Sequence, residues 1–399
     1  MTPLYELLEK FCANGVQFFK LGDLEDDAIL RLGRGDVISK MDLNNTPGHF
    51  PVYSSSATSD GIFGRYGKFM FEDERITWSI DGGGKFFYRH AHQYSVTNVC
   101  GWLKVLQSEK LNTRFLYYVL INAWGERTYN YTVKAHPSVI REDYLIPMPP
   151  IQVQREIVRI LDNFTELEAE LEAELEARQL QFNYIRAALI SNCAENYLSK
   201  PLGSLITHLR TGLNPRQNFV LNSPGSNCAY ITVRELDGFK IRTTEATDKV
   251  DEHGFKVIQK RSKLQAGDVL FSATGTIGRT ALVEETPTNW GIKEGVYAIT
   301  VDSTLLDPRF LIYLFGHSSI YDEIIARSDG STVRSISMAS LKALQVPVPP
   351  LAEQEIIIDI LDVAYELTFE SLPAEIAARR KQYEYYRNKL LTFKKLELA

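Results

Sequence analysis

Two stretches of the chain carry the same pattern of apolar and polar positions, 200 residues apart. The first, PMPPIQVQREIVRILD, covers residues 147–162, and the second, PVPPLAEQEIIIDILD, covers residues 347–362. In the first copy and just beyond it, apolar side chains recur at steps of three and four residues, at Ile157, Ile160, Phe164, Leu167 and Leu171. This spacing places them on one face of an α-helix. Each stretch is therefore predicted to open a long helix with one apolar stripe.

The predicted helices have defined starting points. Proline cannot donate a backbone hydrogen bond and pushes the preceding residue into an extended conformation, so Pro149-Pro150 and Pro349-Pro350 mark the entry into a first helical turn. We expect the helices to begin at about Ile151 and Leu351. An unbroken helix from Ile151 to Ile190 would be about 60 Å long. Two such stripes in one chain most simply pair with each other.

The repeat continues with a shift of one residue. ARQLQFNYIRAALI, residues 177–190, corresponds to ARRKQYEYYRNKLL, residues 378–391, at an offset of 201. One extra residue therefore enters the second copy before residue 378, in an interval that contains Pro373. A repeat of half the chain length predicts two similar halves related by a pseudo-twofold. We also expect the two ends of the chain to meet.

Each half holds a segment with the same predicted order of elements. In the first half, turn residues separate strand-like runs at 51–53, 67–71, 75–80, 85–88 and 95–100, and a predicted helix follows at 111–124. In the second half, strand-like runs at 229–233, 268–272, 280–283 and 295–300 precede a predicted helix at 306–315. Both segments are predicted to be mixed α/β domains built on one scaffold.

The predicted fold class is α+β. Two similar mixed α/β domains, residues 1–146 and 200–346, are expected to be separated by two long antiparallel helices, residues 147–199 and 347–399. The helices are expected to pair like a coiled coil, and the whole to have a circular, pseudo-twofold arrangement.

The net charge of −6 is unevenly distributed. Residues 147–199 hold nine acidic and four basic side chains, and six glutamates lie between 166 and 176, which we interpret as a solvated helix face. The predicted domains 1–146 and 200–346 have net charges of −1 and +2. Near-neutral domains of this kind permit a local basic groove for a nucleic acid.

The cysteines and the apolar runs bear on the compartment. The four cysteines lie far apart without a CxxC pair, at Cys12, Cys100, Cys193 and Cys228. This pattern favours buried free thiols in a reducing cytoplasm over a zinc site or a disulfide framework. The chain opens MTPLYELLEKF without an apolar signal region, and no apolar run approaches the length of a membrane span. We expect a cytoplasmic protein.

Motifs for catalysis are weak. Residues 81–85, DGGGK, lack the spacing and the Ser/Thr of a P-loop and are interpreted as a turn between strands. Asn214-Pro215 begins like an amino-methyltransferase tetrad but lacks its second proline and aromatic residue. His90 and His92 have no Asp, Glu or Cys at metal-ligand spacing. The pattern favours binding over catalysis, with no catalytic residue and no metal site on this chain.

The helical motifs resemble those of a known family. The duplicated P-x-P-P-x-x-x-Q-x-x-I-x-x-I-L-D entry and the closing ARRKQYEYYRNKLL are similar to the specificity subunits of type I restriction-modification enzymes. So are LLEKFCANGVQFFKLGDL at 7–24, LQAGDVLFSATGTIGRTALV at 264–283 and RSISMASLKALQVPVPP at 334–350. The resemblance covers nearly the whole chain.

The resemblance implies that each domain is a target recognition domain that reads one half of a bipartite site on double-stranded DNA. The helices would set the unspecific gap, since helices of about 60 Å can place two readers about one DNA turn apart. It implies that two modification subunits, which methylate adenine, and restriction subunits dock on the chain. S-adenosylmethionine, ATP and Mg²⁺ are expected on those partners. No cofactor, no catalytic role and no membrane attachment is expected for this chain.

Candidate DNA-contacting residues are polar groups and glycines in loops between predicted strands. In the first domain they are Tyr53, Ser54, Ser55, Ser56, Arg65, Trp78, Ser79, Asp81, Gly82, Gly83, Lys85, Arg89 and His90. In the second domain they are Arg210, Thr211, Gly212, Asn214, Arg216, Arg234, Thr274, Thr276, Arg279 and Lys293. Core packing is the alternative for Tyr53 and Trp78, and a solvated surface charge is the alternative for each arginine and lysine.

Two other classes of function stay open. The chain could be a complete enzyme with an unrecognised active site, which reproducible activity of the purified chain alone would indicate. It could be a coiled-coil adaptor whose domains bind proteins, which partner binding without any DNA sequence preference would indicate.

Overall fold

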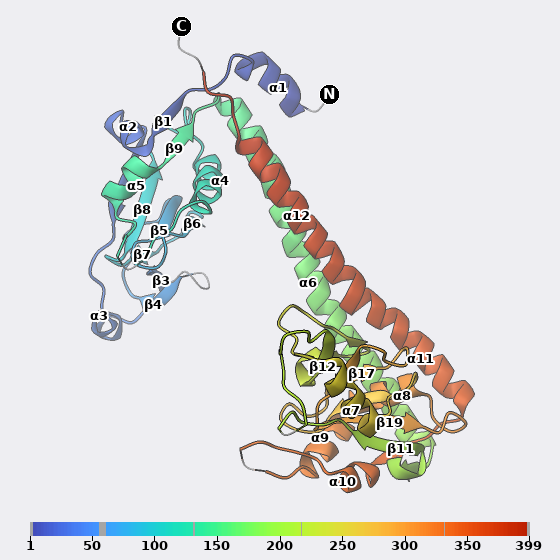
Figure 1. Cartoon of the computed structure of the whole chain (residues 1–399). Helices are drawn as coiled ribbons and strands as arrows, with labels where there is room; N and C mark the ends of the chain where they lie inside the picture. Colours follow the sequence, from blue (N-terminus) through green and yellow to red (C-terminus); the bar gives the residue numbers. More distant parts are fainter. Residues whose placement is uncertain (1–2, 56–60, 131, 217, 331, 397–399) are drawn as a thin grey trace. The chain divides into compact units, whose positions relative to one another are not determined.

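The computed structural model describes residues 3–55, 61–130, 132–216, 218–330 and 332–396 (Figure 1). The chain forms two compact units. The first consists of Met1–Glu172 and Glu375–Ala399, and the second consists of Ala173–Ala374. Each unit therefore contains one α/β domain together with part of each long helix.

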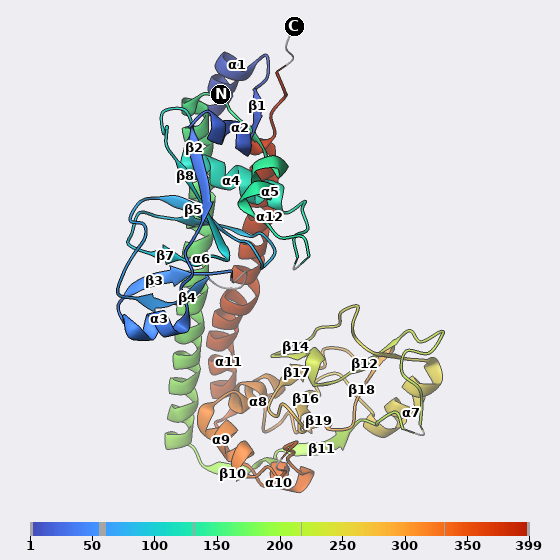
Figure 2. The same ribbon diagram turned by 90° about the vertical axis from the view of Figure 1, so that its left-hand side faces the viewer.

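In the first unit the domain is built on two sheets. The larger has the strand order β2 (Leu30–Arg34), β8 (Cys100–Val105), β5 (Arg75–Ser79) and β6 (Phe86–Arg89). The smaller has the order β4 (Ile62–Tyr66), β3 (Phe50–Tyr53) and β7 (Ser95–Val96), with β3 and β7 parallel (Figure 2). All five residues of β5 are buried, which makes this strand the centre of the domain.

Helices and a short strand pair complete the first unit. They are α1 (Pro3–Cys12), α2 (Leu21–Asp26), α3 (Lys40–Asn45), α4 (Thr113–Trp124), α5 (Pro137–Asp143) and the pair β1 (Phe18–Lys20) with β9 (Leu145–Pro147). The two ends of the described chain meet here, because the Val16 amide donates to the Lys394 carbonyl (2.8 Å) and the Leu396 amide donates to the Val16 carbonyl (2.9 Å). The expectation that the ends meet is confirmed.

The second unit repeats this topology. Its larger sheet has the order β11 (Ile206–Thr211), β19 (Val296–Val301), β16 (Val269–Ser272) and β17 (Thr280–Leu282). Its smaller sheet has the order β15 (Lys249–Val250), β12 (Cys228–Ile231) and β18 (Trp290–Ile292), again with one parallel pair, β12 with β18. The strands β10 (Ser199–Pro201) and β20 (Gln345–Pro347) correspond to β1 and β9.

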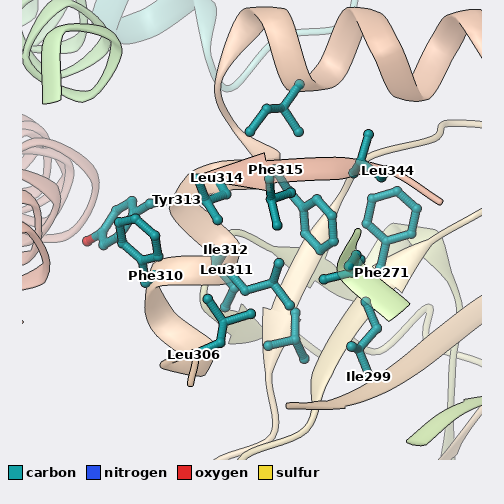
Figure 3. Close-up of a cluster of buried hydrophobic side chains, with 14 of the residues drawn as sticks. Phe271, Ile299, Leu306, Phe310, Leu311, Ile312, Tyr313, Leu314, Phe315 and Leu344 are labelled. Atoms are coloured by element: carbon teal, nitrogen blue, oxygen red, sulfur yellow. The ribbon is translucent and has the colours of Figure 1, made fainter. Parts of the chain in front are cut away.

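The helices of the second unit cover its larger sheet and add to the common scaffold. Helix α8 (Pro308–Phe315) packs its apolar side chains against Phe271 of β16 and Ile299 of β19 in the main core (Figure 3). Further elements are α7 (Glu252–Ser262), α9 (Ser318–Ala326), α10 (Met338–Lys342) and the hairpin of β13 (Leu236–Asp237) and β14 (Lys240–Ile241). The two domains are thus similar and mixed α/β, as predicted.

Most of the predicted strands are present, but two of the predictions differ from the structure. Residues 67–71 form no strand, and the strand of that hairpin is β4, five residues earlier at Ile62–Tyr66. Residues 95–100 are not continuous either, because a turn at 97–99 separates β7 from β8. Asp60-Gly61, a turn signal between the first two strand-like runs of the sequence, lies partly outside the described residues.

The long helices begin where the prolines predict. Helix α6 runs without interruption from Ile151 to Asn196, 46 residues. The second copy begins at Leu351 and consists of α11 (Leu351–Tyr365), a π-helical segment η3 (Glu366–Ser371) and α12 (Leu372–Leu391).

The two copies pair in antiparallel fashion within each unit. In the first unit the Phe164 ring stacks on Tyr386 (5.6 Å between centroids), and Arg380 binds Glu168 (2.5 Å) and Glu172. The contacts therefore move to lower residue numbers in α12 as the residue numbers rise in α6, which is the antiparallel arrangement. In the second unit Phe182 packs against the rings of Tyr365 and Phe369. The predicted pairing of the two stripes is confirmed in both units.

The extra residue of the second copy is absorbed by the π-helical segment. A π-bulge holds one residue more than the α-helix it interrupts, and η3 lies in the interval where the offset changes from 200 to 201. Pro373 follows two residues after η3, in the first turn of α12. The bulge also brings Glu370 to Lys240 (3.0 Å) and Arg242 (2.7 Å) of the second domain.

The repeated glutamine anchors each domain to its helix. Gln154 is fully buried in α6; its Oε1 accepts from the Asn112 amide (2.8 Å), and its Nε2 donates to the carbonyls of Lys110 (2.9 Å) and Pro149 (2.8 Å). These contacts hold the start of α4 against the start of α6. The glutamine of the repeat is therefore the joint between domain and helix.

The second copy repeats this joint atom for atom. Gln354 Oε1 accepts from the Asp307 amide (2.8 Å), and Nε2 donates to the carbonyls of Leu305 (2.9 Å) and Pro349 (2.9 Å). Because the same three backbone groups are satisfied in both units, the sequence repeat encodes one anchoring structure used twice.

The repeated aspartate makes the second anchor. Tyr118 donates to Asp162 Oδ1 (2.5 Å), and Arg114 pairs with the same carboxylate (2.8 Å). In the second copy Tyr313 donates to Asp362 Oδ1 (2.6 Å), and Arg309 pairs with Asp362. Burial, together with the hydrogen bond to Asp162, raises the pKa of the Tyr118 hydroxyl above its usual value, so this donor stays protonated.

Candidate nucleic-acid interface

One edge of the second domain gathers loops that follow four of its strands. The loop after β11 contributes Asn214 and Arg216, the loop after β12 contributes Arg234, the β16–β17 loop contributes Thr274, and the β18–β19 turn contributes residues 293–295. These residues line two adjoining hollows. We call this edge the second loop edge.

A glycine lets the first of these loops approach the last. A Cβ on Gly212 would lie 1.8 Å from the Ile292 carbonyl oxygen, so no other residue fits there without a backbone shift. Gly35 has the same role in the first domain, where a Cβ would lie 2.0 Å from the Val96 carbonyl oxygen. The close approach is therefore a common feature of both domains.

The first domain has the corresponding edge. Ser54, after β3, lies 2.9 Å from the Thr97 hydroxyl, in the β7–β8 turn. Ser79, at the end of β5, donates to the Ser55 carbonyl (2.8 Å) and accepts from the Gly82 amide (2.7 Å). These contacts bring the loops after β3, β5 and β7 together, and we call this edge the first loop edge.

Backbone hydrogen bonds align the two edges position by position. The Ile80 amide donates to the Val99 carbonyl (3.0 Å), and the Ala273 amide donates to the Gly295 carbonyl (2.7 Å). The Gly84 and Gly278 amides donate to the carbonyls of Ser79 (3.1 Å) and Ser272 (3.0 Å). The β5–β6 loop that begins at Asp81 therefore corresponds to the β16–β17 loop that begins at Thr274. The sequence predicts DNA-contacting residues in both of these loops.

The structure brings together six of the predicted residues of the second domain. Those at the second loop edge are Thr211, Asn214, Arg216, Arg234, Thr274 and Lys293. Gly212 supports the edge from beneath. Arg216, Arg234, Thr274 and Lys293 are exposed, and Arg216 adopts a left-handed backbone conformation (φ 37°) at the tip of its loop.

The other predicted residues of the second domain lie elsewhere. Arg210 forms an ion pair within the domain. Its Nη2 lies 2.7 Å from Oδ1 of Asp268, whose side chain is fully buried. Arg279 donates to the Val233 carbonyl (3.4 Å) and lines a hollow beside Tyr365 and Phe369. Thr276 is exposed, and its carbonyl accepts from Ser272 (2.6 Å).

In the first domain five predicted residues lie at the first loop edge with accessible groups. They are Ser54, Ser55, Asp81, Gly82 and Gly83, all half-buried. Asp81 pairs with Lys134 at 2.9 Å, and the Gly83 carbonyl accepts from Trp124 Nε1 (2.8 Å). Ser56 lies outside the described residues.

Burial places the aromatic candidates and one arginine inside the domain. Trp78 is 0% exposed and donates from Nε1 to the Ala135 carbonyl (2.7 Å), so the core-packing alternative fits its position. Ser79 is fully buried beneath the edge. Arg89 and Tyr53 are both buried. The guanidinium carbon of Arg89 lies 3.6 Å from the centre of the Tyr53 ring, in a cation–π contact.

The remaining candidates of the first domain are spread over its surface. Exposed Arg65 in β4 donates to the His49 carbonyl (2.8 Å). Lys85 lies over the Phe87 ring (5.3 Å to the centroid). Exposed His90 lies edge-on to Tyr88 in a hollow next to Asp162 of α6.

Sequence reasoning missed edge residues that the alignment of the two domains reveals. Glu294 lines both hollows of the second loop edge, and Asn98 occupies the corresponding position of the first. Arg34 corresponds to Thr211, because each precedes the glycine of the close approach. The signal available in the sequence was the pair of short motifs Leu32–Gly35 and Leu209–Gly212, in which a leucine stands three residues before each of these glycines.

The chemistry of the edges is that of hydrogen bonding and charge. Among the described residues, no group of three or more His, Cys, Asp and Glu side chains is placed to hold a metal ion. His92, one of the two histidines considered for such a site, has its Nε2 3.1 Å from the Tyr53 hydroxyl and stacks on Tyr94. All four cysteines are free, and burial raises the pKa of the Cys193 thiol to about 11. None of the helices in the described part of the chain is long and apolar enough to span a membrane.

Comparisons with known proteins agree on one class. The chain matches the type I restriction modification DNA specificity domain twice, over residues 14–177 and 200–378. It is 30% identical over 378 residues to S.HindORF215P of Haemophilus influenzae, named as a type I restriction enzyme specificity subunit, with 87% of this chain and 89% of that protein covered. It is 26% identical over 388 residues to S.MpnORF507P of Mycoplasma pneumoniae, named as a type I specificity subunit, with 94% and 97% covered.

A solved structure has the same fold. The type I restriction-modification S subunit from M. genitalium superposes with a TM-score of 0.56 at 15% sequence identity, covering 96% of this chain and 97% of that chain.

Two domains of one topology, each with a polar loop edge and each anchored to a long paired helix, define a bivalent recognition protein. The chain belongs to the type I restriction-modification DNA specificity family, with two copies of the specificity domain. Its role is DNA sequence recognition, and the specificity subunits of this family are not themselves catalytic.

Proposed function

We propose that the two loop edges read the two halves of one bipartite DNA site. The observation that carries this proposal is that the edges are built on the same backbone framework but present different side chains. Asp81 in the first corresponds to Thr274 in the second, and Thr97 corresponds to Lys293. Equivalent frames with different hydrogen-bonding groups suit two readers of different sequences.

The partners follow from this role. Two modification subunits, which would bind S-adenosylmethionine and methylate adenine, and restriction subunits using ATP and Mg²⁺ would assemble on this chain in the cytoplasm. The chain itself would hold no cofactor. The net charge of −6 supports this dependence on partners. A chain with a net negative charge would need other subunits to make most of the contacts with DNA phosphates. The paired helices, rather than the domains, would set the length of the gap between the two half-sites.

The test is a genome-wide map of methylated adenine. A host carrying this chain with its neighbouring modification gene is compared with the same host lacking only this chain. We expect a split motif with an unspecific gap in the first host alone. Unchanged methylation, with the modification subunit expressed and competent, would contradict the proposal. Partner binding without DNA preference would then favour the adaptor alternative.

The exposed cations of the second loop edge should contribute phosphate contacts. Replacing Lys293 or Arg216 with alanine is expected to reduce the slope of log Kd against log salt by about one, because each phosphate contact releases about one counterion. Affinity is measured for the complex with its modification subunits on a duplex carrying the mapped site. Lys200→Ala, an exposed change on β10, is the matched control. Unchanged slopes for both edge variants would show that neither Lys293 nor Arg216 contacts a DNA phosphate.

A further inference from the structure

Glu294 is an acidic residue at the centre of the second loop edge. It lies in the tight turn between β18 and β19, is exposed, and lines both hollows. Its neighbours at the edge include exposed Lys293, Arg216 and Arg234. A carboxylate at a surface that meets phosphates is repelled by them, so its presence calls for a reason other than affinity.

One oxygen of this carboxylate is held and the other is available. Asn214 Nδ2 donates to Glu294 Oε2 at 2.6 Å, while Oε1 accepts no hydrogen bond from the described residues. The side-chain amide of Asn214 cannot be flipped, because its acceptor oxygen Oδ1 would then face the Glu294 carboxylate, which also only accepts hydrogen bonds. The contact therefore fixes the direction of the Glu294 side chain and leaves one acceptor pointing away from Asn214.

Arg234 has an acidic partner other than Glu294. Asp248 binds Arg234 Nη2 at 2.9 Å, with Asp248 also accepting from Asn222 (2.8 Å). Glu294 therefore does not serve to neutralise Arg234. It is an oriented acceptor whose charge is not used in an ion pair within the described residues.

An ionised carboxylate only accepts hydrogen bonds. In the major groove the base groups that donate are the exocyclic amino groups, N4 of cytosine and N6 of adenine. The O6 and N7 of guanine and the O4 of thymine are acceptors and would be repelled by Glu294. The residue thus discriminates between two classes of base edge.

The first domain presents different chemistry at the same place. Val99 and Gly295 accept equivalent backbone hydrogen bonds, so Asn98 corresponds to Glu294. An amide both donates and accepts and suits the N6 and N7 pair of adenine, whereas a carboxylate demands donors only. The two domains therefore differ at a position where a difference changes the base read.

We propose that Glu294 is a specificity-determining residue of the second domain that requires a base with an exocyclic amino group at one position of its half-site. The inference rests on the proposed reading of a bipartite site and names the chemistry of one contact within it.

The experiment maps methylated adenine in hosts that carry the modification gene with the unaltered chain or with Glu294→Gln. Glutamine keeps the size of the side chain and the acceptor for Asn214, and adds a donor. We expect the preference for cytosine or adenine at one position of one half-site to fall by about 5- to 100-fold, with the other half-site and the gap unchanged. Glu285→Gln is the matched control, since Glu285 is exposed in the same domain on a different hollow.

The outcomes separate the inference from the function on which it rests. A split motif that is identical for the unaltered chain and Glu294→Gln overturns the inference and leaves the proposed function intact. A uniform change at all positions also overturns it, because Glu294 would then act only through its charge. The absence of a split motif from the host with the unaltered chain overturns the proposed function and the inference together.

Discussion

Replacing Gln154 with leucine should lower the free energy of unfolding of the first unit by about 3–5 kcal/mol. Leucine is of similar size but cannot form these hydrogen bonds. The Asn112 amide and the Lys110 carbonyl, in partly buried contacts, and the Pro149 carbonyl, in a buried one, would lose their partner. Each orphaned buried group costs about 1–3 kcal/mol. The measurement is urea unfolding of the full chain, followed by tryptophan fluorescence and circular dichroism.

The repeat supplies the internal comparison. Gln354→Leu should have an effect of the same size on the second unit, because it orphans the Asp307 amide and the carbonyls of Leu305 and Pro349. Gln152→Leu, an exposed change on the first turn of α6, should cost less than about 0.5 kcal/mol. Losses below 1 kcal/mol for both buried variants would show that the glutamines do not anchor the domains.

The helices could be predicted from the sequence because their signals are local. Proline pairs fix the starts at Ile151 and Leu351, and the apolar steps fix the stripe. The change of offset from 200 to 201 located the irregularity, but not its form, the π-bulge η3, or the ion pairs of Glu370 with Lys240 and Arg242. Such contacts join residues far apart in sequence and leave no local pattern.

Short strands were harder to predict. Strand β18 has only three residues, Trp290–Ile292, and β4 exposes most of its side chains, so neither shows an apolar alternation. Helix α7 was missed because its apolar residues are few among polar ones, and its N-cap, Asp251, is the only strong local signal. These elements are stabilised by the sheets and loops they join rather than by their own pattern.

The turn residues predicted where the loops of the candidate interface lie, but not which of the side chains near them are buried. Trp78 was a candidate DNA contact with core packing as its alternative; it lies in the core, where the Ala135 carbonyl 57 residues away accepts its indole hydrogen. Arg210 was a candidate DNA contact with a solvated surface charge as its alternative, and it is paired with buried Asp268. Glu294 was not among the predicted contacts, and its place beside the loop after β12 comes from the parallel pairing of β12 with β18, which brings distant loops to one edge.

Shortening α6 by seven residues, Glu170–Glu176, is expected to abolish methylation at the original bipartite sites, with a loss of at least 100-fold. Seven residues are about two helical turns, so the faces of α6 stay nearly in phase, rotated by about 20°, while the helix loses about 10 Å, the length of about three base pairs. A new set of sites should appear with the same two half-sites and a gap shorter by about three base pairs. Adenine methylation mapped across the genome measures both effects.

Loss of charge has to be separated from loss of length in this experiment. The deletion removes Glu172, which binds Arg380 in the first unit, and Glu172→Gln removes that ion pair at constant length. An exposed pair of this kind contributes at most about 1 kcal/mol, so Glu172→Gln should methylate the original sites with the original gap. If the deletion alters a half-site and keeps the gap, the spacing is not carried by α6.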